Sequence, residues 1–128
     1  GIHTIGRSYN TSVARNYFHH LAAGVAPSHA QAAQSIVYVD NWSCGLAVRD
    51  NVVDACPHTK QGYYYFQNAR IALAHHNTLD GLWMRDGGTI SGHGVPCNCS
   101  NVVVVPNDQP LPAEAQAIVR AAGPRPTA

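Results

Sequence analysis

The stretch VRDNVVDACPHTKQGYYYFQNARIALAHHNTLDG, residues 48–81, contains two similar phrases, RDNVVDA and HHNTLDG. In each phrase an asparagine is followed, after one residue, by an aliphatic side chain and then by an aspartate. Related phrases surround Asn16 and Asn101, so four asparagines recur at spacings of 35, 26 and 24 residues. Self-similarity at a period of about 20–50 residues is typical of solenoids and arrays. The sequence therefore predicts a repeat architecture.

Each repeat contains short strand-like runs that end in turn-forming residues, with no helix between them. The aromatic and β-branched runs are residues 35–41, 62–68 and 81–87. The longest spacing contains a small-residue stretch at 22–34, which we interpret as a loop inserted into one repeat. Short strands joined by polar corners at a period of about 24 residues favour an all-β fold, a parallel β-helix over residues 1–106.

The recurring asparagines have a structural role in such a fold. Equivalent residues of stacked coils lie about 4.8 Å apart, so asparagines at one corner can exchange amide hydrogen bonds along the stack and satisfy one another. We therefore expect the asparagines at 16, 51, 77 and 101 to form a ladder and to belong to the scaffold.

With these features the sequence resembles the right-handed parallel β-helix proteins of the pectate-lyase-like superfold. The phrases that carry the resemblance are NTSVARNYFHHL, SIVYVDNWSCGLAVRDNVVDA and ARIALAHHNTLDG, and they cover most of residues 10–105. The resemblance implies a right-handed parallel β-helix of about four coils, and it is specific for the fold rather than for any one activity.

The carboxyl-terminal phrase PLPAEAQAIVRAAGPRP predicts a short helix. Pro112 suits the first helical turn, Glu114 lies near the positive end of the helix dipole and Arg120 near the negative end. We expect residues 107–123 to form a capping helix that covers the last coil and its open strand edge, and residues 124–128 to form a tail.

The amino-terminal phrase GIHTIGRSYN has no comparable cover, because strand-like residues begin almost at once. An uncapped first coil presents an open edge. We therefore expect either preceding coils or a neighbouring subunit to stack on this N-terminal coil.

Composition excludes some classes of partner. The 128-residue chain has a formal net charge of +1 and 12% charged residues, which does not resemble a nucleic-acid-binding surface. No apolar run approaches the roughly 20 residues that span a bilayer, and Gly1 does not begin a signal sequence. We expect a soluble chain, mature or truncated, with no membrane span and no nucleic-acid partner.

The cysteines and glycosylation sequons favour an oxidising compartment. Four cysteines, Cys44, Cys56, Cys97 and Cys99, lack the spacing of a zinc site. Three N-x-S/T sequons begin at Asn10, Asn41 and Asn98. An even cysteine count together with sequons favours an extracellular or cell-surface glycoprotein, although chance sequons and free buried thiols in a cytosolic protein are an alternative. We expect no metal and no cofactor.

The resemblance implies activity on complex carbohydrates, in a groove on the outer face of successive coils. Alignment on the asparagines places His19, Asp54 and Asp80 three residues after an asparagine, in one column of candidate catalytic residues. Carboxylates one coil apart would match the separation of about 5 Å in retaining glycosidases. Aspartate is also a common turn residue, so the pair can arise without a catalytic role.

Other residues are candidates for glycan binding. A second column immediately before the asparagines contains Arg15, Asp50 and His76; it is either a sugar-binding strip or a surface charge ladder. Related sequences often carry an acidic residue where Asp40 ends the YVD run, but Asn41 supplies no second acid. In the run Tyr63–Phe66, alternate rings fill the interior, and an outward ring such as Tyr64 could stack on sugar.

Two functions follow. The first is a non-catalytic module of an extracellular or cell-surface glycoprotein that binds glycan or stacks on a neighbouring subunit in an assembly. The second is the C-terminal part of a polysaccharide hydrolase or lyase. The weak acid constellation and the open first coil favour the first, while analogy of fold alone favours the second.

Overall fold

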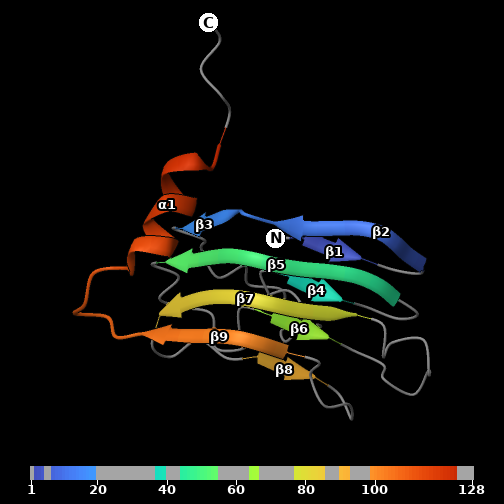
Figure 1. Ribbon diagram of the computed structural model, residues 1–128. Helices are drawn as coiled ribbons and strands as arrows, with labels where there is room; N and C mark the ends of the chain where they lie inside the picture. Colours follow the sequence, from blue (N-terminus) through green and yellow to red (C-terminus); the bar gives the residue numbers. More distant parts are fainter. Residues whose placement is uncertain are drawn as a thin grey trace, which may run out of the picture.

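The computed structural model describes residues 2–4, 7–19, 37–39, 44–54, 64–66, 77–85, 90–92 and 99–123. In these ranges the chain is mostly β, with two parallel sheets and one short helix near the carboxyl end (Figure 1). The predicted all-β class, the parallel pairing and the C-terminal helix are thereby confirmed. The predicted inserted loop, residues 22–34, and the predicted tail, residues 124–128, lie outside the described residues.

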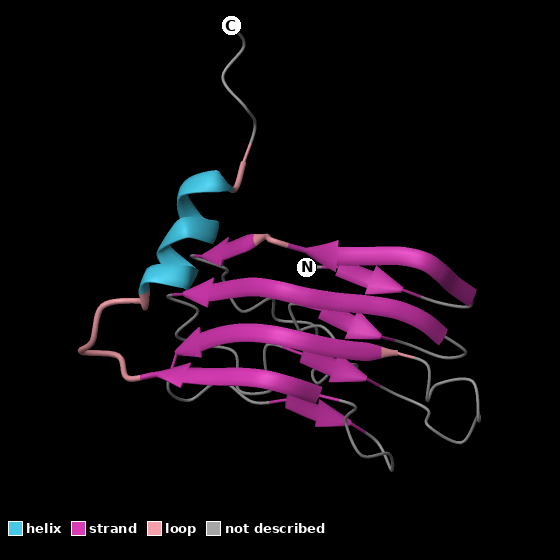
Figure 2. Ribbon diagram, viewed as in Figure 1, coloured by secondary structure: helices cyan, strands magenta, loops and turns pink. Residues whose placement is uncertain are grey.

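The two sheets receive strands alternately along the chain. The first sheet has the order β1-β4-β6-β8 and consists of β1 (Ile2–Thr4), β4 (Val37–Val39), β6 (Tyr64–Phe66) and β8 (Ile90–Gly92). The second has the order β2-β5-β7-β9, with β3 also pairing with β5, and consists of β2 (Arg7–Ala14), β3 (Tyr17–His19), β5 (Cys44–Asp54), β7 (Thr78–Arg85) and β9 (Cys99–Val105). The strands of one sheet run alongside those of the other, as Figure 2 shows.

The main hydrophobic core lies between the two sheets. Val37 of the first sheet joins residues of the second in one buried cluster, against which Ile2 and Ile90 also pack. The buried members are Val13, Val37, Leu46, Val48, Val53, Leu79, Leu82 and Met84. Because side chains of a strand alternate between its two faces, this cluster defines the inner face of the five-stranded sheet.

Four chain segments share a bend at which one left-handed residue of each interrupts that alternation; Asn10 and Gly45 are left-handed as well, nearer the start of β2 and β5. The residues at the bend are Arg15, Asp50, Gly81 and Asn101, with φ of 56°, 52°, 89° and 52°. The register places them side by side, since Arg49 pairs with Asp80 and Asp80 with Ser100 immediately before the bend. A Cβ at Gly81 would lie 2.5 Å from Asp50 Oδ1, so glycine suits both the backbone and the close contact at this position.

The predicted asparagine ladder is wrong in part, because the register differs from the sequence alignment. Asn51 lies opposite Leu82, and Leu82 lies opposite Val102. Asn16 and Asn51 do form a rung: Asn51 Oδ1 accepts hydrogen bonds from Nδ2 and the backbone N–H of Asn16, both at 3.0 Å. Asn77 instead accepts a hydrogen bond from the backbone N–H of Leu46 at 3.0 Å.

The same shift affects the strand-like runs. The runs at 35–41 and 62–68 contain β4 and β6 of the first sheet, as expected for equivalent positions. The run at 81–87 overlaps β7, which belongs to the second sheet. The true equivalent of β6 is β8, a three-residue strand whose sequence, ISG, is too short to give a strong pattern.

The sequence predicted that the helix covers the last coil. In the structure the helix instead packs against β5. Helix α1 (Ala113–Ala121) buries Ala115 and Ile118 against Val52 of β5. Tyr17 and Trp83, the neighbours of Val52 in the register, also pack in this cluster. The helix therefore lies on the outer face of the five-stranded sheet, beside the carboxyl ends of β3 and β5 (Figure 1), because an outward apolar column there matches its apolar stripe.

Candidate functional site

The register separates Asp80 from the other two candidate catalytic residues. His19 lies opposite Asp54, as predicted. Asp80, however, lies opposite Arg49 on β5 and opposite Ser100 on β9, so the predicted single column is wrong for Asp80. Arg49 is five residues from Asp54, which corresponds to about 16 Å of extended strand. Even with the bend at Asp50, this exceeds the separations of about 5–9.5 Å that paired carboxylates of glycosidases have.

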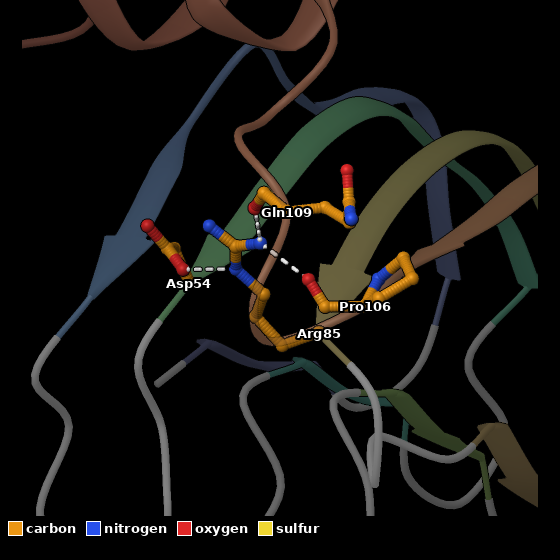
Figure 3. A network of polar contacts seen from close by, with 4 residues as sticks. All are labelled: Asp54, Arg85, Pro106 and Gln109. Carbon is orange, nitrogen blue, oxygen red and sulfur yellow. Dashed lines mark hydrogen bonds and ion pairs between the residues drawn. The ribbon is translucent and has the colours of Figure 1, made fainter.

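Asp54 is part of an ion-pair network at the carboxyl ends of β5 and β7 (Figure 3). Arg85 Nε donates to Asp54 Oδ1 at 2.7 Å, and the two side chains are 16% and 21% exposed, respectively. Arg85 Nη1 donates to the backbone oxygens of Pro106 at 2.9 Å and Gln109 at 2.5 Å. This network ties the segment between β9 and α1 to two strands, so Asp54 has a structural partner for its charge.

Asp80 belongs to a separate, exposed cluster at the bend of the sheet. Its Oδ1 accepts hydrogen bonds from Asn101 Nδ2 at 2.7 Å and from Ser100 Oγ at 2.9 Å. These bonds, that of Asn101 first, lower the pKa of the Asp80 carboxyl, and slight desolvation opposes them. A carboxyl held in its ionised form is poorly suited to donate a proton as a general acid.

The hydrogen bonds to Asp80 make a testable prediction about pH. We expect a carboxyl NMR titration to give Asp80 a pKa below its ordinary range, and Asn101→Ala to raise that pKa more than Ser100→Ala does. Because the folded-state pKa is depressed, this contribution to stability is present above the unfolded-state pKa and is lost as the pH falls through the folded-state pKa. An unchanged Asp80 pKa in Asn101→Ala would contradict this assignment.

Two of the candidate binding residues lie side by side in the structure. Arg15 and Asp50 are neighbours at the left-handed bend, as the predicted second column requires, but the next position in that column is Gly81. His76, the third predicted member of that column, and Asp40, a separate candidate, lie outside the described residues. Tyr64 lies in β6, opposite Val37 and Ile90.

His19 ends β3 and stacks on a neighbouring aromatic ring. The His19 and Tyr17 rings are parallel within 18°, with centroids 4.5 Å apart. Tyr17 also packs in the cluster under α1. His19 therefore extends an outward aromatic patch at the carboxyl end of β3, next to Asp54 in the register.

Sequence reasoning missed Arg85, which bonds to the Asp54 carboxylate and to the backbone oxygens of Pro106 and Gln109. The sequence contains a signal that could have identified it. Arg85 occupies the position of β7 that corresponds to Asp54 of β5, one residue beyond the pair Val53 and Met84. An alignment of Asp50-Asn51 with Gly81-Leu82 would have paired the two opposite charges.

Three further observations bear on the environment. Among the described residues, no three His, Cys, Asp or Glu side chains come together in a way that could hold a metal ion. The described part of the chain contains no helix long and apolar enough to cross a membrane. Cys99 is disulfide-bonded.

No family model, curated protein or solved structure matches this chain.

Proposed function

We propose that the chain forms about four coils of a right-handed parallel β-helix, with one strand of each sheet in every coil. Two features support this proposal. The strand orders β1-β4-β6-β8 and β2-β5-β7-β9 add one strand to each sheet in turn. The left-handed residues at 15, 50, 81 and 101 repeat one corner at equivalent positions, as stacked coils require.

We propose further that the chain is a non-catalytic module of an extracellular or cell-surface glycoprotein, which binds glycan or stacks on a neighbouring subunit in an assembly. The observation that carries this proposal is the register, since it separates Asp54 from Asp80 along the sheet. Each aspartate is instead bound to neighbours that hold its charge, Arg85 in one case and Ser100 with Asn101 in the other.

The cysteine and sequon chemistry supports the extracellular part of this proposal. A disulfide bond, such as the one at Cys99, forms and persists in an oxidising compartment. The sequon that begins at Asn10 lies on β2, where the side chains of Asn10, Thr11 and Ser12 are all exposed. An exposed asparagine is what a glycosylation site needs.

The alternative, the C-terminal part of a polysaccharide hydrolase or lyase, can be tested against the module directly. We expect the chain to turn over no member of a panel of neutral and acidic polysaccharides, and Asp80→Asn and Asp54→Asn/Asp80→Asn to leave that result unchanged. Reducing-end release and the absorbance of unsaturated products report hydrolysis and elimination separately.

The matched control is Asp108→Asn, which changes an exposed acid in the segment before α1. Circular dichroism melts of every variant show whether the fold is retained, since Asp54→Asn weakens the pair with Arg85. Turnover by the wild-type chain that Asp80→Asn abolishes, with the melt and the Asp108→Asn activity unchanged, would establish the enzyme instead.

A further inference from the structure

Strand β2, at one edge of the five-stranded sheet, contains a bulge that includes Asn10. The register shifts between Arg7 and Thr11, so residues 8–10 of β2 lie where β5 has only Gly45. Asn10 and Gly45 are both left-handed, with φ of 63° and 75°. Asparagine is among the few residues other than glycine that adopt this conformation readily. A bulge re-aims side chains of its strand, so Asn10 is not presented as it would be in a regular strand.

The bulge leads into the sequon Asn10-Thr11-Ser12. All three side chains are exposed, whereas the next residue, Val13, is 8% exposed and belongs to the core between the sheets. The sequon therefore ends where the packed part of β2 begins, and a bulky group on the Asn10 amide would displace no core side chain. In the described part of the chain β2 pairs with β5 only, so this group would stand at an edge of the sheet.

The sequon that begins at Asn98 differs in its contacts. Its third residue, Ser100, donates its hydroxyl to Asp80 Oδ1 at 2.9 Å, and its middle residue, Cys99, is disulfide-bonded. Asn98 itself and the sequon at 41–43 lie outside the described residues. A sequon is defined by its asparagine and by the hydroxyl two residues later. Because the hydroxyl of the Asn98 sequon is already used in the fold, the described contacts favour the sequon at Asn10.

We propose that Asn10 is an N-glycosylation site and that its glycan covers the bulged end of the β2 edge. The proposal rests on the glycoprotein function above and assigns its modified residue. In the transfer, Asn10 Nδ2 bonds to the anomeric carbon of a lipid-linked diphosphate oligosaccharide, and the bond from that carbon to the phosphate oxygen breaks. The lipid diphosphate leaves, and one amide proton passes to a base. The exchange needs no oxidant or reductant, and it leaves a bulky, hydrated group on the side chain.

The covering role follows from the position of Asn10. An edge strand presents backbone groups that can pair with another chain, and natural proteins protect such edges with bulges, charges or a covering segment. Strand β2 has its bulge at residues 8–10. A glycan on Asn10 would place a steric and hydrated barrier at the same point, so the two devices would protect one end of the edge together.

The first test is the position of the glycan on the 128-residue chain secreted from a eukaryotic host. We expect an amidase that cleaves N-linked glycans in heavy-oxygen water to leave a labelled aspartate at position 10. Asn10→Asp and Ser12→Ala should each lose the mass of a glycan, and Ser12→Thr, which keeps a hydroxyl, should retain it. The matched control is Ser100→Ala, which removes the hydroxyl of the Asn98 sequon and should leave the glycan mass unchanged.

The fold of these variants is checked on unglycosylated protein. Aspartate also tolerates a left-handed backbone, and Ser12 is exposed, so Asn10→Asp and Ser12→Ala should keep the wild-type circular dichroism spectrum and melt. An unlabelled residue 10, or a glycan mass that Asn10→Asp leaves unchanged, would overturn the site. Glycan mass lost in Ser100→Ala but not in Ser12→Ala would overturn it as well.

The second test addresses the covering role. Ser12→Ala keeps a neutral Asn10 without its glycan, so light scattering should show a higher weight-average mass than for the glycosylated wild type at equal concentration. Adding Thr11→Lys to Ser12→Ala should reverse the increase, because a lysine on an edge strand opposes pairing. Equal masses for Ser12→Ala and the wild type, or an increase that Thr11→Lys leaves in place, would show that the glycan does not protect this edge.

Failure of this inference and failure of the proposed function give different results. A glycan found only at another sequon would overturn Asn10 as the site while the chain remained a glycoprotein. A secreted chain with no glycan at any sequon would contradict the glycoprotein function itself. Turnover abolished by Asp80→Asn would overturn the non-catalytic module without moving the glycan.

Discussion

Replacing Asn51 by alanine is expected to lower the free energy of unfolding by about 3 kcal/mol, because several buried polar groups lose a partner at once. Asn51 is 2% exposed. Its Oδ1 accepts from the backbone N–H and from Nδ2 of Asn16, and its Nδ2 donates to the backbone oxygen of Val13 at 2.9 Å. Alanine would leave the backbone N–H of Asn16 and the backbone oxygen of Val13 without these partners in a largely buried site.

Two other asparagines provide matched controls for this prediction. Asn16→Ala removes one side chain but leaves Asn51 Oδ1 bonded to the backbone N–H of residue 16, so a loss of about 1 kcal/mol is expected. Asn101 is exposed and bonds to Asp80, so Asn101→Ala should cost less than about 1 kcal/mol. Urea unfolding measures all three. Equal losses at positions 51 and 101 would show that burial of Asn51 contributes nothing.

The recurrence of asparagine was enough to predict the class of fold but not the register. A strand alternates with period two, so a single left-handed residue changes which of the following side chains point inward. That residue is Asp50 in one segment and Gly81 in the next. Alignment on asparagine therefore matched Asn51 with Asn77, whereas the bend matches it with Leu82.

The pairing of candidate acids failed for the same reason. Once Asn77 is five positions out of register with Asn51, every residue counted from it moves as well, and Asp80 meets Arg49 rather than Asp54. The sequence does contain the correcting signal. A glycine at the bend is the residue that adopts positive φ most easily, and Gly81 precedes Leu82 as Asp50 precedes Asn51.

The position of α1 illustrates a different limit of sequence reasoning. Amphipathicity predicted that one face of the helix is buried, and Ala115 and Ile118 confirm it. The apolar stripe of a helix does not specify which surface it packs against, however. Here that surface is the outward column of Tyr17, Val52 and Trp83, which exists only because the register stacks those three residues.

Arg85→Met should release the segment between β9 and α1 and lower the free energy of unfolding by about 2–4 kcal/mol. The substitution keeps an apolar stem of similar length but removes three contacts: the ion pair with Asp54 and the hydrogen bonds to the oxygens of Pro106 and Gln109. It also leaves the largely buried Asp54 carboxylate without this partner. Asp54→Asn should have a smaller effect, since an amide oxygen can still accept from Arg85 Nε.

The network fixes where the chain enters α1, so its loss should loosen the helix more than the sheet. We expect amide hydrogen exchange in α1 to accelerate in Arg85→Met while β5 and β7 retain their protection, because the inter-sheet cluster does not depend on Arg85. The control is Arg120→Ala, which removes an exposed arginine from the last turn of the same helix. If α1 amides keep their protection in Arg85→Met, burial of Ala115 and Ile118 alone holds the helix, and Arg85 is not its anchor.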